Sequence, residues 1–250
     1  MRVIVFAHHH AELMSGGAER AAYSLFQQIN RTEEHEAVLV AHATHDKLGH
    51  DGNFASFRGR ENEILWAAPG IDHFTFLSHD HNRLRRDLIE LIDYIKPDVI
   101  HFHHYTNFGL DAFEIIKEHC NLPILLTLHE YLMICHHNGQ MVKHPSMKLC
   151  KVSSPAECNA CYPDINAGKF FLREQIIKHN LAFVDHFISP SEFLAQRYRQ
   201  WGVKDDKISV IENLLPQELI NQAALLDKPI APDFADPKQK LRLGYFGQIN

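Results

Sequence analysis

The sequence predicts an α/β protein with a doubly wound, Rossmann-like parallel sheet and a cysteine-rich loop insertion. Short runs rich in β-branched residues and leucine alternate along the chain with segments whose apolar residues recur at helical spacing. Runs of this kind are typical of strands buried on both faces, and their alternation with helices indicates parallel βαβ crossovers. A composition of 45% hydrophobic and 22% charged residues over 250 residues supports a globular core and excludes disordered and fibrous chains.

Each predicted element follows from a local pattern. Strands are expected where the apolar runs lie, at residues 3–7, 38–41, 98–102, 124–128, 186–189 and 208–211. Apolar residues recur every three or four positions between Ala18 and Ile29 and between Leu84 and Ile95, which predicts two helices. Further helices are expected at about 108–119, 167–184 and 191–201, the last opened by serine and proline.

Several regions interrupt this alternation. Residues 44–60 are polar and glycine-rich, and are expected to form a loop. Residues 134–166 have few apolar positions and form a cysteine-rich insertion within an N-terminal domain of residues 1–215. Residues 216–240 contain several prolines and are expected to be an interdomain linker, and residues 241–250 the first strand of a truncated second domain.

Charge and hydropathy limit the classes of partner. The formal net charge of −6 disfavours nucleic acid, and no segment is long and apolar enough to cross a bilayer or to act as a signal peptide. A cytoplasmic protein is therefore expected. Arg83, Arg85 and Arg86 open a helix, where they are either a solvated face or a contact for anionic lipid headgroups at the membrane surface.

A glycine pair marks the first turn from strand to helix. Gly16 and Gly17 follow the first strand and open the first helix, where glycine lets the backbone approach an anion at the helix N-terminus. A tight turn with no ligand is the alternative. The complete GxGxxG pattern is missing, which argues against a nicotinamide dinucleotide site.

Histidines gather where two predicted strands end. His101, His103, His104 and Tyr105 lie at or just beyond the end of the strand at 98–102, and His129-Glu130-Tyr131 follows the strand at 124–128. The carboxyl ends of parallel strands form the ligand crevice of such sheets. A single histidine there is commonly structural, but several at one edge favour a functional site, with His129 as the leading candidate because it ends a buried strand.

Four cysteines share the insertion. Cys135, Cys150, Cys158 and Cys161 follow the spacing C-x14-C-x7-C-x2-C, which fits tetrahedral thiolate coordination of zinc. Ligation would give a loop without a core the free energy it needs to hold one shape. An iron–sulfur centre, a redox pair at Cys158 and Cys161, and idle thiols are the alternatives, and Cys120 is expected to be an ordinary core thiol.

These motifs, in their order along the chain, resemble those of a known family. The resemblance rests on Ser-Gly-Gly-Ala-Glu-Arg at 15–20, Lys-Pro-Asp-Val-Ile-His at 96–101, Leu-Thr-Leu-His-Glu-Tyr at 126–131, Ile-Ser-Pro-Ser at 188–191 and Ile-Glu-Asn at 211–213. The chain resembles the N-terminal, acceptor-side half of the retaining GT-B glycosyltransferases of family four. Residues 245–250 are similar to the strand that begins that family's donor-binding domain, and the four cysteines resemble a loop that some members carry.

The resemblance implies an enzyme that moves a sugar from a nucleotide-sugar to a glycan or lipid-linked acceptor with retention. Gly16 and Gly17 would face the donor diphosphate, and His129 would contact the transferred sugar. The acceptor cleft would be lined by His9, His103, His104, Tyr105, Glu130 and Tyr131. Glu130 stands where the family usually has aspartate.

The family's donor-gripping residues belong to the second domain, so this chain is expected to be inert alone. A metal-stabilised binding or regulatory module on a Rossmann-like scaffold is the alternative function.

Overall fold

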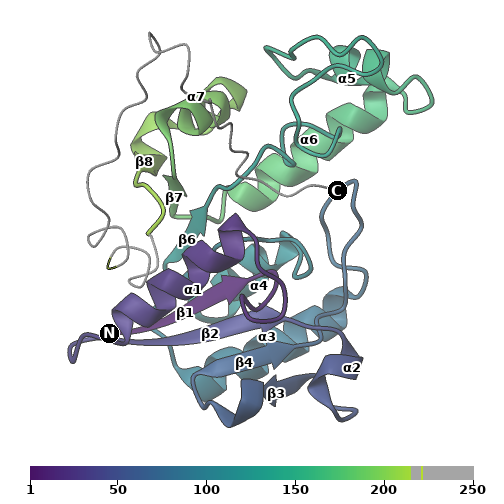
Figure 1. Ribbon diagram of the computed structural model, residues 1–250. Coiled ribbons are helices and arrows are strands. Elements are labelled where there is room, and N and C mark those ends of the chain that lie inside the picture. The colour runs from purple at the N-terminus through teal and green to yellow at the C-terminus, as the bar shows by residue number, and fades with distance from the viewer. Residues whose placement is uncertain (215–220, 222–250) are drawn as a thin grey trace, which may run out of the picture. The chain divides into compact units, whose positions relative to one another are not determined.

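The computed structural model describes residues 1–214 and residue 221. Residues 1–214 contain an eight-stranded sheet in the order β3-β4-β2-β1-β5-β6-β7-β8, in which only β3 runs antiparallel to its neighbour (Figure 1). The strands are β1 (Arg2–Ala7), β2 (Glu36–His42), β3 (Phe54–Ser56), β4 (Glu63–Trp66), β5 (Val99–Phe102), β6 (Ile124–Thr127), β7 (His186–Ser189) and β8 (Ile208–Val210). The chain winds outward from β1 in both directions, so the order reverses between β1 and β5. In doubly wound sheets, ligands bind beyond the carboxyl ends of the strands at this switch point.

Helices cover both faces of the sheet. They are α1 (Gly17–Ile29), α2 (His45–Leu48), α3 (His81–Ile95), α4 (Asp111–Cys120), α5 (Pro155–Cys161), α6 (Ala167–Leu181) and α7 (Glu192–Trp201). Side chains alternate along β1, so Val3 and Val5 pack with α1 while Ile4 and Phe6 join the cluster that contains α3 and α4. In the described part of the chain, no helix is long and apolar enough to span a membrane.

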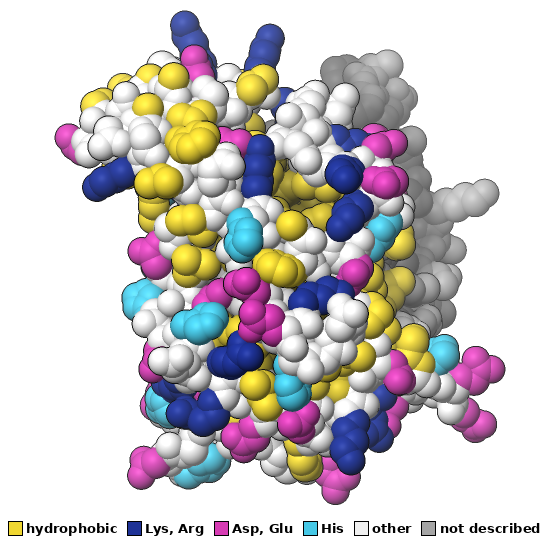
Figure 2. Space-filling view, turned by 180° about the vertical axis from the view of Figure 1, so that it is seen from behind, with side chains coloured by type: hydrophobic (Ala, Val, Ile, Leu, Met, Phe, Trp, Pro, Cys, Tyr) yellow, Lys and Arg dark blue, Asp and Glu magenta, His cyan; other side chains and the backbone are white. Residues whose placement is uncertain are grey.

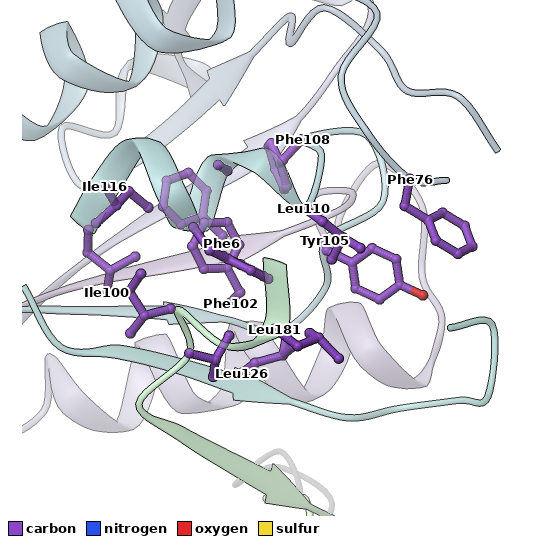
Figure 3. Packing of buried hydrophobic residues seen from close by; sticks show 14 of the residues in the cluster. Phe6, Phe76, Ile100, Phe102, Tyr105, Phe108, Leu110, Ile116, Leu126 and Leu181 are labelled. Carbon is purple, nitrogen blue, oxygen red and sulfur yellow. The ribbon is translucent and has the colours of Figure 1, made fainter. Parts of the chain in front are cut away.

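The largest cluster of buried side chains lies beneath the switch point (Figure 3). The rings of Phe6 on β1 and Phe102 on β5 stack with centroids 4.4 Å apart, and Phe108 meets Phe6 edge to face at 5.2 Å. Aromatic pairs of this geometry contribute about 0.5–1.5 kcal/mol each beyond the burial of their area. The two strands that flank the switch point are therefore held in a fixed register.

The predicted alternation of strands and helices is confirmed, and one expected loop is wrong. Residues 44–60 contain α2, β3 and a 3₁₀ turn at Phe57–Gly59, and β4 follows them without having been predicted. Strand β4 begins with Glu63, and a charged residue at this position obscures the apolar pattern by which strands are predicted. Glu63 is nevertheless buried, with 6% of its surface exposed. Its carboxylate accepts hydrogen bonds from Arg60 at 3.0 Å and pairs with His10 at 2.7 Å, which compensates the buried charge.

The cysteine-rich insertion lies between β6 and α6. Its first residues belong to the core, contrary to expectation, because Ile134, Cys135 and Met141 are buried in the main cluster. Beyond them, no residue from 142 to 169 is buried. The predicted linker at 216–240 and the predicted strand at 241–250 lie outside the described residues, except for position 221.

Candidate functional site

Five histidines from three strands meet at the switch point. His8 and His9 follow β1, His104 follows β5, and His129 follows β6. The rings of His8 and His104 lie 4.3 Å apart between centroids. His129 Nε2 is 3.2 Å from Nδ1 of His103, which also follows β5, so a hydrogen bond joins the ends of β5 and β6. The predicted convergence of histidines at the carboxyl edge is therefore present in the fold.

Two residues that the sequence did not single out hold His8 in place. Glu19, on the first turn of α1 and 5% exposed, accepts a hydrogen bond from His8 Nε2 at 2.9 Å. Asn107 donates from Nδ2 to the His8 carbonyl at 3.0 Å, and its φ of 75° lies in the left-handed region that asparagine tolerates. The asparagine directly after His-Tyr-Thr was the only available signal, since its contact with His8 joins loops that lie far apart in sequence.

The surroundings of Gly16 and Gly17 differ. A Cβ at Gly16 would lie 2.6 Å from Oε2 of Glu19, so this position is glycine because the carboxylate folds over it. A Cβ at Gly17 would meet no atom within 4 Å. Gly17 is the first residue of α1, and its φ lies outside the left-handed region. Neither packing nor backbone geometry within the described residues therefore requires glycine at position 17.

Burial keeps the imidazoles of this edge neutral. It lowers the pKa of His129 to about 4, with the nearby His8 adding to the effect. Burial likewise holds the pKa of His103 and of His104 well below the ordinary 6.5, with neighbouring histidines as the second cause. The pKa of His9 is lowered for the same two reasons. At neutral pH these rings offer hydrogen-bond donors and acceptors without positive charge.

Glu130 supports the loop after β6. Its Oε1 accepts a hydrogen bond from the Tyr105 hydroxyl at 3.2 Å, and its other carboxylate oxygen accepts from the backbone N–H of Leu132. The Tyr198 hydroxyl donates to the Glu130 carbonyl at 2.9 Å. Burial raises the pKa of this carboxyl to about 7 despite those hydrogen bonds. The Glu130 side chain reaches from this loop to Tyr105 after β5, which accounts for a side chain longer than the aspartate usual in the family.

The structure places the expected acceptor residues unevenly. His9, Glu130 and Tyr131 are partly exposed, whereas His103 and His104 are buried, with 5% and 6% of their surface exposed. Tyr105 is 2% exposed and packs edge to face on Phe76, so its ring belongs to the core and not to an open cleft.

A large hollow lies at the other end of the sheet. It has a volume of about 660 Å³ and is lined by residues at the amino ends of the strands, among them Arg2, Glu36 and Asn62. Ligands of doubly wound sheets bind at the carboxyl ends, so we do not assign the active site to this cavity.

The four cysteines of the insertion line one small cavity. Cys135, Cys150, Cys158 and Cys161 surround a volume of about 20 Å³, together with residues that include His137. All four are free thiols. Burial raises the pKa of Cys150, and the other three thiols raise it further, as expected for neighbours. Within the described residues, no group of three or more His, Cys, Asp or Glu side chains is placed so that it could hold a metal ion.

The arginines at the start of α3 each face a carboxylate. Arg83 and Arg86 pair with the buried Asp87 at 3.5 and 3.2 Å, and Arg85 pairs with Glu118 at 2.5 Å. Because Arg83 and Arg86 share one carboxylate, two of the three positive charges are compensated within the chain, and these pairs do not by themselves indicate a lipid headgroup.

Comparisons with known proteins agree with the fold and identify the family. A sequence model of Glycosyltransferase Family 4 matches residues 15–218. A sucrose-phosphate synthase structure from Thermosynechococcus elongatus is similar with a TM-score of 0.51 and 10% identity, over 90% of this chain and 95% of that one. A UDP-N-acetylglucosamine 2-epimerase from Rickettsia bellii is similar with a TM-score of 0.50 and 13% identity, over 90% of this chain and 48% of that one. The chain thus spans about half the length of the epimerases it resembles. A search of curated proteins gave no match.

Proposed function

The chain belongs to glycosyltransferase family 4, and from that membership we propose that it is the acceptor-side domain of a retaining glycosyltransferase. The enzyme would move a sugar from a nucleotide-sugar to a glycan or lipid-linked acceptor. The synthase and the Rickettsia bellii epimerase share its fold at low identity, and the epimerase is named for a nucleotide-sugar, UDP-N-acetylglucosamine. A nucleotide-sugar is therefore the class of donor we propose.

The open space at Gly17 carries this proposal. The position lies at the N-terminus of α1, where free backbone N–H groups and the helix dipole favour an anion. Since the fold itself leaves room for a side chain there, glycine is best explained by a ligand that must come close to the backbone. The donor diphosphate is an anion of this kind, and it gains charge as the sugar leaves.

His129 would steady the transferred sugar. Its ring is neutral at pH 7, and it lies on the same edge as Gly17 because β1 and β6 both flank β5. Nε2 of the adjacent His103 and Nδ1 of His8 are buried without a hydrogen-bond partner among the described residues. This unmet capacity supports a polar ligand at the edge, such as sugar hydroxyls.

In the proposed enzyme this site would form one wall of the donor cleft, so we propose that this chain alone binds donors weakly and transfers no sugar. Titration with UDP-glucose, UDP-N-acetylglucosamine and GDP-mannose should give a Kd of about 1 mM or weaker, or about 4 kcal/mol of binding free energy. In an NMR titration, the amide shifts should centre on Gly17 and the residues beside it. Binding in the micromolar range would contradict the domain assignment.

Gly17→Ala is the decisive variant. The added methyl group meets no atom of the described residues within 4 Å, so stability should not fall, but it would lie between the backbone and a phosphate. The amide shifts should therefore disappear in Gly17→Ala and persist in Gly168→Ala, a matched substitution near the start of α6. Equal binding by both variants would remove the helix N-terminus from the site.

Cytoplasmic placement and peripheral contact with a membrane are further proposals. Hydrophobic side chains are visible on the surface near α5 and α6 in Figure 2, and Leu149, Val152 and Leu172 are 77%, 65% and 59% exposed. Co-sedimentation with anionic vesicles tests the contact, and no binding at low salt would contradict it.

A further inference from the structure

The insertion lacks the usual means of holding a shape. No residue from 142 to 169 is buried, and none of the seven residues of α5 is buried. A short hairpin, closed by a bridge between Val142 and Leu149, precedes this helix. Isolated hairpins and helices of one or two turns are marginal in water. Something other than apolar burial must therefore stabilise this segment.

The cysteines come from different parts of the insertion and line the same cavity. Cys135 ends the buried segment, Cys150 ends the hairpin, and Cys158 and Cys161 lie three residues apart on one face of α5. All four line the cavity of about 20 Å³, which has room for one sphere of the size of a water molecule. A single ion of similar size fits the same space.

A buried cation lies close to these sulfur atoms. Arg173 on α6 is 4% exposed and donates to the carbonyls of Leu132 and Met133 at 2.6 and 2.8 Å. Its Nε has no partner among the described residues. Cys158 and Cys135 are among the groups that act on it electrostatically. Four thiolates around a divalent ion carry a net charge of −2, so a buried guanidinium with a free N–H is a suitable neighbour.

We propose that Cys135, Cys150, Cys158 and Cys161 bind one divalent metal ion of the zinc class in a tetrahedral, structural site. Each thiol gives up its proton and becomes a ligand, so the four protons leave as the ion enters. Binding would require the side chains to turn toward the ion, because no three of them are placed to hold one within the described residues. A site with four protein ligands has no open position, which assigns it to structure and not to catalysis.

The ion would also anchor the loop that follows His129. Ser153 in the insertion donates from Oγ to the Ile134 carbonyl at 2.9 Å, next to the ligand Cys135. Arg173 holds the two carbonyls before it. The metal therefore ties the insertion to the segment that begins with Glu130, and its loss should loosen both.

Metal analysis of the purified chain tests the proposal directly. We expect about one zinc per chain, and replacement by Co²⁺ should give the near-ultraviolet sulfur-to-cobalt charge-transfer band of thiolate ligation. Cys158→Ser should abolish both signals. Cys120→Ser, a free cysteine outside the cavity, is the matched control and should retain them. Hydrogen exchange should rise after chelation over 142–166 while the sheet stays protected.

Several outcomes would overturn the proposal. One is a purified chain that carries no metal and takes up no Co²⁺, and whose four thiols react with a labelling reagent as fast in the folded protein as in denaturant. Another is a disulfide between Cys158 and Cys161 in protein kept under reducing conditions. A visible band that bleaches on reduction, with iron and sulfide present, would replace the single ion by a cluster.

Discussion

Glu130 gives the stability of this chain a pH dependence that can be calculated. Burial raises the pKa of its carboxyl from the ordinary 4.5 to about 7 in the folded protein. Unfolding returns it to the ordinary value, so the folded state binds the proton more tightly. Stability from this group is complete below pH 4.5, falls as the pH rises toward 7, and stays low above it.

The size of the effect follows from the two pKa values. Each pKa unit corresponds to about 1.4 kcal/mol, so the difference between 4.5 and about 7 sets an upper limit of about 3.4 kcal/mol. The side chain remains 26% exposed, which reduces the desolvation. We therefore expect a loss of about 1–2.5 kcal/mol between pH 5 and pH 8.

Glu130→Gln isolates this contribution. Glutamine keeps an acceptor for the Leu132 N–H and cannot ionise, so the variant should gain about 1–2.5 kcal/mol relative to the parent between pH 5 and pH 8. Urea unfolding at four pH values measures the difference. Glu33→Gln, at an exposed carboxylate, should differ from the parent by less than about 0.5 kcal/mol throughout. A difference between Glu130→Gln and the parent that is the same at pH 5 and pH 8 would refute the reasoning.

Three further substitutions probe the site and its support. In an enzyme that joins this chain to its donor-binding half, His129→Ala should lower kcat by about a hundredfold or more with little change in Tm; wild-type turnover would exclude it from the mechanism. Asp87→Ala removes a buried acceptor 3.2 Å from Trp66 Nε1 and should cost about 3–5 kcal/mol in urea unfolding, unlike an exposed aspartate. Gly16→Ala should displace the Glu19 carboxylate and cost about 1–2 kcal/mol; unchanged stability would show that this carboxylate moves freely.

Six of the eight described strands could be predicted from local sequence, whereas β3 and β4 could not. β1, β5 and β6 are largely buried and largely apolar, with Arg2, His101 and Thr127 as their polar residues. β4 opens with a buried glutamate whose compensation by His10 and Arg60 depends on tertiary structure. Local sequence cannot predict that a buried charge is neutralised by residues from another loop.

The same division applies to the site. Placing His103 and His129 at one edge needed only the ends of two neighbouring strands. The contacts of His8 with Glu19 and Asn107 could not be predicted, because they depend on the paths of the loops that carry these residues. Local sequence thus predicts which residues gather at the edge, and long-range contacts determine how each is oriented.

The Glu19 carboxylate determines where an anion can approach α1. It lies over Gly16 and accepts a hydrogen bond from His8, so it already occupies that side of the helix N-terminus. A phosphate on the same side would meet a buried negative charge, and repulsion between like charges is strong where water is excluded. The side of Gly17 has no such neighbour within 4 Å of a Cβ position. We therefore interpret the two adjacent glycines differently: Gly16 accommodates a carboxylate of the chain, and Gly17 is the position at which we propose that an external anion approaches.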